Sequence, residues 1–174
     1  MSLQEYQEKN KKIQDLFWQY FTPHTKKTIH AYLPIQKQKE VNTWPIIQQL
    51  QKEGHTIVIP KVIADNALEN IIFYPHTALQ EDQWGISSPV QYKKTEIVPP
   101  KNIDILLVPT LIVDQKGYRI GYGKGFYDRL LAQCRKDAVR IGCCFEKPVP
   151  TIADRDPWDV PLHYCITPEK VYSF

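Results

Sequence analysis

The residues most able to perform chemistry lie in one short segment, residues 117–129, which reads GYRIGYGKGFYDR. Four of the protein's seven glycines fall within residues 117–125. Lys124 stands between two of them, and Asp128 follows them at the predicted start of a helix. Because glycine permits backbone conformations that other residues avoid, this segment can bend sharply and bring its amide groups close to a ligand.

The spacing of the glycines excludes two familiar nucleotide-binding loops. A Walker A loop needs four residues between its glycines and a serine or threonine after Gly-Lys, but Lys124 is followed by Gly125. The dinucleotide fingerprint GxGxxG needs a glycine where Phe126 stands. The pattern that remains is GxGxG, formed by Gly121, Gly123 and Gly125.

A GxGxG loop that opens a helix is suited to bind phosphate. Its N–H groups can converge on an anion, and the helix N-terminus adds partial positive charge. Lys124 would add a mobile ammonium group, Arg119 a planar guanidinium group and Asp128 an oxygen ligand for Mg²⁺. Alternatively, the glycines only let a strand, a loop and a helix pack closely, and Asp128 completes the first helical turn. The spacing leaves both interpretations open.

A few residues outside the loop's backbone could also take part in a site. Glu40 lies between a predicted strand and a predicted helix, where it could anchor a ligand or be solvated. Three aspartates near the C-terminus could join a metal site or form a solvated turn: Asp154, Asp156 and Asp159. Four aromatic residues could stack on a flat ligand or anchor the loop to the core: Tyr118, Tyr122, Phe126 and Tyr127.

The hydrophobic pattern predicts the elements that position this loop. Helices are predicted at about residues 4–21, at 43–54, with Thr43 as N-cap and Pro45 in the first turn, and from Gly125 onwards. Apolar runs predict strands at residues 28–34, 55–60, 70–75, 103–109, 111–113, 138–145 and 164–168. The polar, proline-rich stretch at 80–101 reads as a surface connection.

Strands that alternate with helices indicate an α/β fold, and several strands are too continuously apolar to have a solvated face. We therefore expect a doubly wound, largely parallel sheet with helices on both faces, a Rossmann-like layered fold in one domain over residues 1–174. Ligands of such sheets bind beyond the carboxyl ends of the strands. The glycine loop follows the apolar run at residues 103–113, so it lies where that rule places a site.

The composition excludes several classes of protein. A net charge of +3 suits an anionic small molecule but is far from the clustered charge of a nucleic-acid-binding protein. No run approaches the roughly 20 apolar residues of a membrane span, and the start lacks the apolar core of a signal peptide. The four cysteines form no C-x-x-C pair, which favours reduced thiols over zinc or disulfides. A cytoplasmic protein without nucleic-acid or membrane partners is expected.

Most of the chain resembles the 5-formyltetrahydrofolate cyclo-ligases, also called 5,10-methenyltetrahydrofolate synthetases. The segment VPTLIVDQKGYRIGYGKGFYDRLL is similar to their signature: a proline after an apolar strand, an aspartate turn, then R-[LI]-G-x-G-x-G-[YF]-Y-D. The segment from AYLP through KEVNTW to IPKV resembles the family's first half, and WDVPLHYCITPEKVY resembles its C-terminal part. The resemblance extends from about residue 28 to residue 174.

The resemblance implies a ligase of one-carbon metabolism that needs ATP and Mg²⁺. Its reaction converts 5-formyltetrahydrofolate to 5,10-methenyltetrahydrofolate, ADP and phosphate through an iminium phosphate, a phosphorylated formyl group. The resemblance implies ATP binding by Arg119, Ile120, Gly121, Tyr122, Gly123, Lys124, Gly125, Phe126, Tyr127 and Asp128. It implies substrate contacts from Ile35, Glu40 and Tyr127, catalytic roles for Arg119, Lys124 and Tyr127, and metal binding by Asp128 and Asp159. A monomer is expected.

The sequence departs from the family pattern at two places. Family members usually begin with a basic helix whose cations reach ATP, whereas this chain begins MSLQEYQEKNKK, so that helix is expected to be missing. Ser88 stands where an acidic residue before proline is common. The departures motivate a second hypothesis, a catalytically weakened protein of the same fold that binds folate or nucleotide. A third, a different enzyme such as a sugar-phosphate isomerase, has no sequence feature in its favour.

Overall fold

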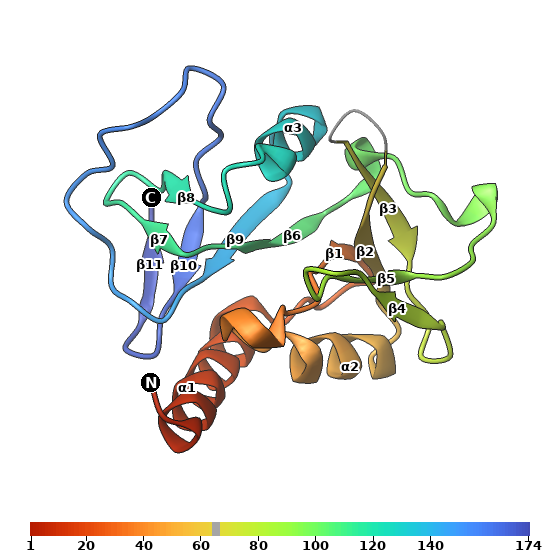
Figure 1. The fold of residues 1–174 in the computed structure, drawn as a ribbon, viewed down its shortest axis with the longest axis horizontal. Helices are drawn as coiled ribbons and strands as arrows, with labels where there is room; N and C mark the ends of the chain where they lie inside the picture. The colour runs from red at the N-terminus through yellow and green to blue at the C-terminus, as the bar shows by residue number, and fades with distance from the viewer. Residues whose placement is uncertain (64–66) are drawn as a thin grey trace.

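A central mixed sheet organises the protein, which the computed structural model describes over residues 1–63 and 67–174 (Figure 1). The sheet has seven strands in the order β11-β10-β9-β6-β1-β2-β3. They are β1 (Thr28–His30), β2 (Thr56–Val62), β3 (Leu68–Ile72), β6 (Ile105–Pro109), β9 (Val139–Cys143), β10 (Tyr164–Ile166) and β11 (Val171–Ser173). The strands from β10 to β2 run parallel, and the two edge strands run antiparallel to their neighbours. The prediction of a largely parallel sheet is confirmed.

Helices cover both faces of the sheet: α1 (Leu3–Phe21), α2 (Trp44–Lys52) and α3 (Phe126–Gln133). Figure 1 shows α1 and α2 on one side and α3 on the other. Alternate residues of β6 enter two separate cores: Ile105 and Leu107 pack with residues of α1 and α2, whereas Leu106 and Val108 pack with residues of α3. Because both faces of β6 are buried, its sequence is continuously apolar. The predicted doubly wound arrangement is therefore confirmed.

The elements that the hydrophobic pattern did not predict are short and lie at the margins of the fold. The stretch predicted as a connection contains the antiparallel pair β4 (Leu79–Glu81) and β5 (Ser87–Pro89). Strand β11 was also missed, although it pairs with β10 along the sheet edge. Elements this short carry too few alternating apolar residues to be recognised, so hydrogen bonding to neighbours in the folded chain determines them.

Strand β1 is shorter than predicted and ends at His30. The chain then runs through residues 31–35 into a short 3₁₀ turn, Gln36–Gln38, which leads to Glu40. Thr43 stands at the N-cap position of α2 as predicted, but it forms no side-chain cap. Its hydroxyl instead donates to the Tyr32 carbonyl at 2.6 Å. Thr43 therefore joins α2 to the segment after β1, and this bond helps fix the region around Glu40.

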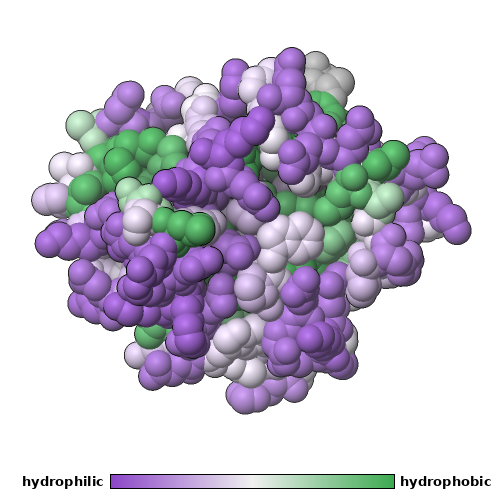
Figure 2. Space-filling model, turned by 60° about the horizontal axis from the view of Figure 1, so that its bottom comes forward, coloured by the Kyte–Doolittle hydropathy of each residue, from purple (hydrophilic) through white to green (hydrophobic). Residues whose placement is uncertain are grey.

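The surface that carries α1 and α2 is predominantly polar. Figure 2 shows hydrophilic side chains over most of this side and apolar ones in separate patches. In the described part of the chain, none of the helices combines the length and apolarity that crossing a bilayer requires.

Candidate functional site

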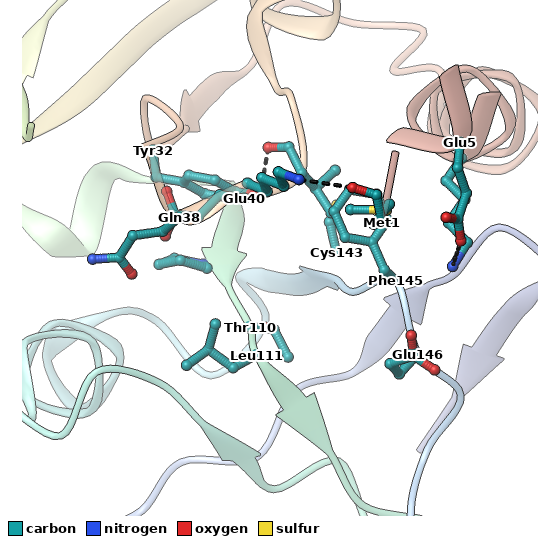
Figure 3. A pocket seen from close by; sticks show the side chains of 14 residues that line it. Met1, Glu5, Tyr32, Gln38, Glu40, Thr110, Leu111, Cys143, Phe145 and Glu146 are labelled. Carbon is teal, nitrogen blue, oxygen red and sulfur yellow. Dashed lines mark hydrogen bonds and ion pairs between the residues drawn. The ribbon is translucent and has the colours of Figure 1, made fainter. Parts of the chain in front are cut away.

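The segments that follow the parallel strands meet at one edge of the sheet and line a cavity of about 430 Å³. Tyr32 follows β1, Thr110 follows β6 and Phe145 follows β9. Glu40 forms another part of the wall, as Figure 3 shows. Both the volume and the position at the carboxyl ends of the strands are typical of small-molecule sites in α/β proteins.

Glu40 is a partly buried carboxylate with fixed hydrogen bonds, so it is not the freely solvated glutamate of the alternative interpretation. Its Oε2 accepts a hydrogen bond from the Ile35 N–H at 2.6 Å. Its backbone carbonyl accepts one from the Tyr6 hydroxyl at 2.8 Å. Burial raises the pKa of Glu40, and the hydrogen bonds from Ile35 and Tyr122 oppose this rise. The carboxylate is thus held in place at the cavity wall.

Ile35 engages both of its backbone polar groups within the chain. Its N–H donates to Glu40, and its carbonyl accepts from the Gln38 N–H at 3.1 Å. A substrate acceptor would therefore have to displace Glu40 from the Ile35 N–H, whereas a substrate donor could use the second lone pair of the Ile35 carbonyl. In this structure Ile35 acts by orienting Glu40.

The glycine loop reaches Glu40 through Tyr122. The Tyr122 hydroxyl lies close enough to the Glu40 carboxylate to interact with it as a hydrogen-bond donor. Burial raises the pKa of Tyr122, and this hydrogen bond and the charge of Glu40 raise it further. The hydroxyl therefore keeps its proton and can donate a hydrogen bond to the carboxylate. The two parts that the resemblance assigns to nucleotide and to folate therefore interact through Tyr122 and Glu40.

The loop itself connects β8 (Arg119–Ile120), a two-residue strand that the sequence did not predict, to α3, the helix that was predicted to follow it. Gly123 (φ 75°) and Gly125 (φ 64°) adopt left-handed backbone conformations, which explains why glycine is needed at both. A Cβ atom added to Gly121 or Gly123 would have no atom of the described residues within 4 Å. The space beside these two glycines is thus open, and it can accommodate a phosphate group against the backbone. Lys124 lies between Gly123 and Gly125, and it is exposed.

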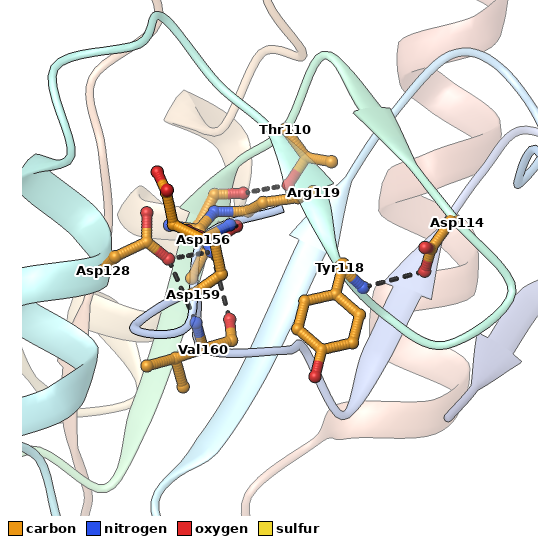
Figure 4. Close-up of polar contacts among 9 residues, drawn as sticks. Thr110, Asp114, Tyr118, Arg119, Asp128, Asp156, Asp159 and Val160 are labelled. Carbon is orange, nitrogen blue, oxygen red and sulfur yellow. Dashed lines mark hydrogen bonds and ion pairs between the residues drawn. The ribbon is translucent and has the colours of Figure 1, made fainter. Parts of the chain in front are cut away.

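Arg119 and Asp128, expected to meet phosphate and metal respectively, are paired with each other (Figure 4). Arg119 Nη1 lies 3.1 Å from Asp128 Oδ1 and donates to the Val160 carbonyl at 3.2 Å. The Val160 N–H also donates to Asp128 Oδ1 at 3.2 Å. The side chain of Arg119 is 5% exposed. These bonds tie the glycine loop to the segment around Val160, and phosphate binding by Arg119 would require its guanidinium to extend beyond them.

Asp128 and Asp159 lie near each other in Figure 4 but do not form a complete metal site. Asp159 Oδ2 accepts a hydrogen bond from the Asp156 N–H at 2.9 Å. Among residues 1–63 and 67–174, no group of three or more histidine, cysteine or acidic side chains is arranged to hold a metal ion. Both bonds that the described residues make to the Asp128 carboxylate use Oδ1, so Oδ2 is the oxygen that can meet a cation. This donor set fits Mg²⁺, which commonly binds one or two carboxylates together with substrate phosphates.

Asp114, which the sequence showed only as a turn residue, fixes the hairpin that carries Arg119. Its buried carboxylate accepts backbone hydrogen bonds from Lys116 at 2.9 Å, Tyr118 at 3.0 Å and Ile152 at 3.1 Å. The hairpin pairs β7 (Ile112–Val113) with β8. Asp114 therefore sets the geometry of β8 from a distance, and its place directly after β7 in the family-like signature was the available clue.

His30 and Asn70 form a buried polar chain behind Tyr127 that the sequence did not reveal. His30 Nδ1 lies 2.9 Å from Asn70 Oδ1, and its Nε2 lies 3.2 Å from the Tyr127 hydroxyl. Burial lowers the pKa of His30 to about 4, and the bond to Asn70 opposes this shift. His30 is therefore neutral at physiological pH. The clue was a polar ring at an inward-facing position of a buried strand.

The free energy of unfolding is expected to decrease as the pH is lowered, because of His30. The unfolded chain binds a proton with the ordinary pKa of 6.5, whereas the folded state resists protonation until about pH 4. The neutral His30 side chain contributes up to about 3 kcal/mol to the free energy of unfolding. This contribution is complete above pH 6.5 and is lost as the pH falls towards 4. Urea unfolding from pH 7.5 to 4.5 measures it. The variant His30→Gln is expected to show a shallower pH dependence; identical dependences would contradict this prediction.

Cys143 lines the cavity but is unsuited to nucleophilic catalysis. Burial raises the pKa of its thiol to about 12, so the thiol stays protonated at neutral pH. The cavity therefore offers a fixed carboxylate and hydroxyl groups, and the glycine loop, which lies outside its lining, offers an open backbone and an exposed lysine. Such groups can bind and orient two ligands and stabilise charge on phosphate.

The sequence matches the profile of the 5-formyltetrahydrofolate cyclo-ligase family over residues 1–168. It is 28% identical over 139 residues to the 5-formyltetrahydrofolate cyclo-ligase of Escherichia coli K12, covering 78% of this chain and 75% of the relative. It is 32% identical over 143 residues to that of Mycoplasma pneumoniae, covering 82% and 74%.

The fold is also similar to solved structures with related names. The Aquifex aeolicus 5,10-methenyltetrahydrofolate synthetase has a TM-score of 0.80 and 27% identity, covering 99% of this chain and 84% of that chain. A Mycoplasma pneumoniae 5,10-methenyltetrahydrofolate synthetase has a TM-score of 0.70 and 28% identity, covering 95% and 88%. The family, the fold and the glycine loop at the carboxyl edge agree, and the chain belongs to the 5-formyltetrahydrofolate cyclo-ligase family of enzymes.

Proposed function

We propose that the protein catalyses the ATP- and Mg²⁺-dependent cyclisation of 5-formyltetrahydrofolate to 5,10-methenyltetrahydrofolate, with release of ADP and phosphate. The observation that supports this most directly is the contact between Glu40 and the glycine loop through Tyr122. It brings a fixed carboxylate and an open phosphate cradle to the same edge of the sheet. The proposal includes a cytoplasmic, single-domain monomer without nucleic-acid or membrane partners.

The glycine loop is the proposed nucleotide site. The backbone at Gly121 and Gly123 has room for phosphate oxygens, and the N-terminus of α3 adds partial positive charge. Lys124 would place an ammonium group on the outer phosphates. Oδ2 of Asp128, with Asp159 beside it, would hold Mg²⁺, which neutralises phosphate charge when bound.

Glu40 is the proposed folate ligand. A carboxylate held at a cavity wall can accept N–H hydrogen bonds from the edge of a pterin ring. Because the Tyr122 hydroxyl donates to the same carboxylate, a pterin N–H would have to share Glu40 with Tyr122 or displace it. Either event would transmit folate binding to the glycine loop.

The proposed chemistry requires positioning and charge neutralisation more than a protein nucleophile. The formyl oxygen attacks the terminal phosphorus of ATP, and ADP leaves. The resulting iminium phosphate is attacked at carbon by N10 of the folate. Inorganic phosphate then leaves, N10 loses its proton and the five-membered ring is closed. Lys124 and the loop amides are placed to stabilise charge on the transferred group.

The proposal is tested by mixing protein, Mg·ATP and 5-formyltetrahydrofolate and measuring the absorbance of the methenyltetrahydrofolate that forms. Product that forms only when all components are present is the expected result. The second candidate, a binding protein without turnover, is favoured by the pairing of Arg119 with Asp128, which removes one expected phosphate ligand. Tight binding of both ligands without product would support that candidate and contradict the enzymatic proposal.

Asp128→Asn is expected to raise the Mg²⁺ concentration needed for half-maximal activity by about tenfold, which corresponds to losing one charged contact. Asparagine can still accept the bonds from Arg119 and Val160 through its amide oxygen, so the fold is expected to persist. Asp159→Asn is expected to give a smaller shift, and Asp154→Asn, at an exposed position, serves as the control. If neither Asp128→Asn nor Asp159→Asn shifts the Mg²⁺ titration, phosphates and water hold the metal without these carboxylates.

A further inference from the structure

The buried chain behind Tyr127 joins three elements that are distant in sequence. His30 lies on β1, Asn70 on β3 and Tyr127 on α3. His30 has no exposed surface, and its ring meets the Tyr127 ring edge-on, with centroids 5.6 Å apart at 79°. This packing, together with the hydrogen bonds of 2.9 Å to Asn70 and 3.2 Å to Tyr127, gives the tyrosine ring one defined orientation.

The directions of the hydrogen bonds that link Asn70, His30 and Tyr127 follow from the bond between Asn70 and the Val98 carbonyl. The Val98 carbonyl can only accept, so the nitrogen of the Asn70 amide donates to it, at 3.4 Å. The amide oxygen therefore faces His30 and accepts a hydrogen bond from Nδ1–H. A neutral imidazole has only one such proton, so Nε2 carries a lone pair. The Tyr127 hydroxyl must then donate to His30 Nε2.

This direction limits what the Tyr127 hydroxyl can offer to a ligand. Its single proton is committed to His30, so only oxygen lone pairs remain for a further partner. Phosphate oxygens are also acceptors and would find no proton there. The pterin ring and N10 of a reduced folate carry N–H groups, which can donate to this oxygen. Tyr127 also interacts electrostatically with both Glu40, the proposed folate ligand, and Arg119 of the glycine loop.

We propose that His30, supported by Asn70, is a positioning residue that makes the Tyr127 hydroxyl an acceptor for an N–H group of the folate and not a donor to nucleotide phosphate. The inference rests on the proposed function, and it divides the two roles that the resemblance gives Tyr127. The ring of Tyr127 can border the nucleotide, but its hydroxyl accepts a hydrogen bond from the folate.

A double-mutant cycle on the full-length protein tests this. His30→Phe and Tyr127→Phe are each expected to weaken 5-formyltetrahydrofolate binding by about threefold to tenfold, the range for one neutral hydrogen bond. The affinity for ADP is expected to stay within twofold in both variants. If His30 acts through the hydroxyl, the double variant binds folate no more weakly than Tyr127→Phe alone. Calorimetry with each ligand, beside urea unfolding of each variant, provides the measurements.

Folding defects are separated from positioning by His30→Gln, whose side-chain oxygen can still accept a hydrogen bond from Tyr127. This variant is expected to retain folate affinity within about threefold. Additive losses in the double variant, a loss of ADP affinity in place of folate affinity, or a folded His30→Gln protein as weak as His30→Phe would each overturn the inference. Wild-type protein that binds 5-formyltetrahydrofolate without turnover contradicts only the proposed enzymatic function, whereas absence of folate binding contradicts both.

Discussion

Replacing Glu40 with alanine is expected to weaken 5-formyltetrahydrofolate binding by about 100-fold, or about 3 kcal/mol, the upper range for hydrogen bonds to a charged group. The carboxylate is held by Ile35 and Tyr122 at the cavity wall, so its orientation is already set before a ligand arrives. Pre-organisation of this kind makes a lost contact costly for binding. Calorimetric titration with 5-formyltetrahydrofolate gives the measurement.

Two variants separate the charge of Glu40 from its other contacts. Glu40→Gln keeps the size and one acceptor oxygen, and it is expected to lose part of the folate affinity. Tyr122→Phe removes only the hydroxyl that donates to Glu40, so it is expected to change folate affinity by less than tenfold. ADP binding to Glu40→Ala within threefold of wild type is the matched control. Unaltered folate affinity in a folded Glu40→Ala protein would show that this carboxylate serves only the loop.

The second large effect is expected from Lys124→Ala, which should raise the KM for ATP and lower kcat. Losing a charge-assisted phosphate contact costs about 1.5–3 kcal/mol, roughly 10- to 150-fold in kcat/KM. Lys124 is exposed and adjoins open space beside Gly123, so its side chain does not fill the core. The urea midpoint is therefore expected to remain that of the wild type.

Lys116→Ala is the matched control for this prediction, since Lys116 is also an exposed lysine of the signature segment but lies in the turn before β8. Its removal is expected to leave ATP kinetics unchanged. Steady-state rates over a range of ATP concentrations, at saturating folate and Mg²⁺, give both parameters. Equal kinetics for Lys124→Ala and wild type would rule out a phosphate role for this lysine.

Long sequence patterns predicted their elements correctly, whereas very short elements left no recognisable pattern. The run at Ile105–Pro109 is apolar at consecutive positions, and the structure buries both of its faces as that pattern predicted. Strands β8 and β11 and the β4–β5 pair were missed because two or three residues show no periodicity. Thr43 had the residue type and position of an N-cap, but its hydroxyl is used by the Tyr32 carbonyl. Local propensity was overridden there by a tertiary contact.

The sequence by itself determined the fold class, the family and the position of the glycine loop between a strand and α3. These follow from local features: apolar periodicity, and glycines at Gly123 and Gly125, where the backbone is left-handed. Only the tertiary structure decided which polar groups meet, because hydrogen-bond partners such as Arg119 and Val160, or His30 and Tyr127, come from separate elements. The sequence shows which side chains can donate or accept hydrogen bonds. Buried polar groups must be paired, and the packing of the helices and strands determines which partners they meet.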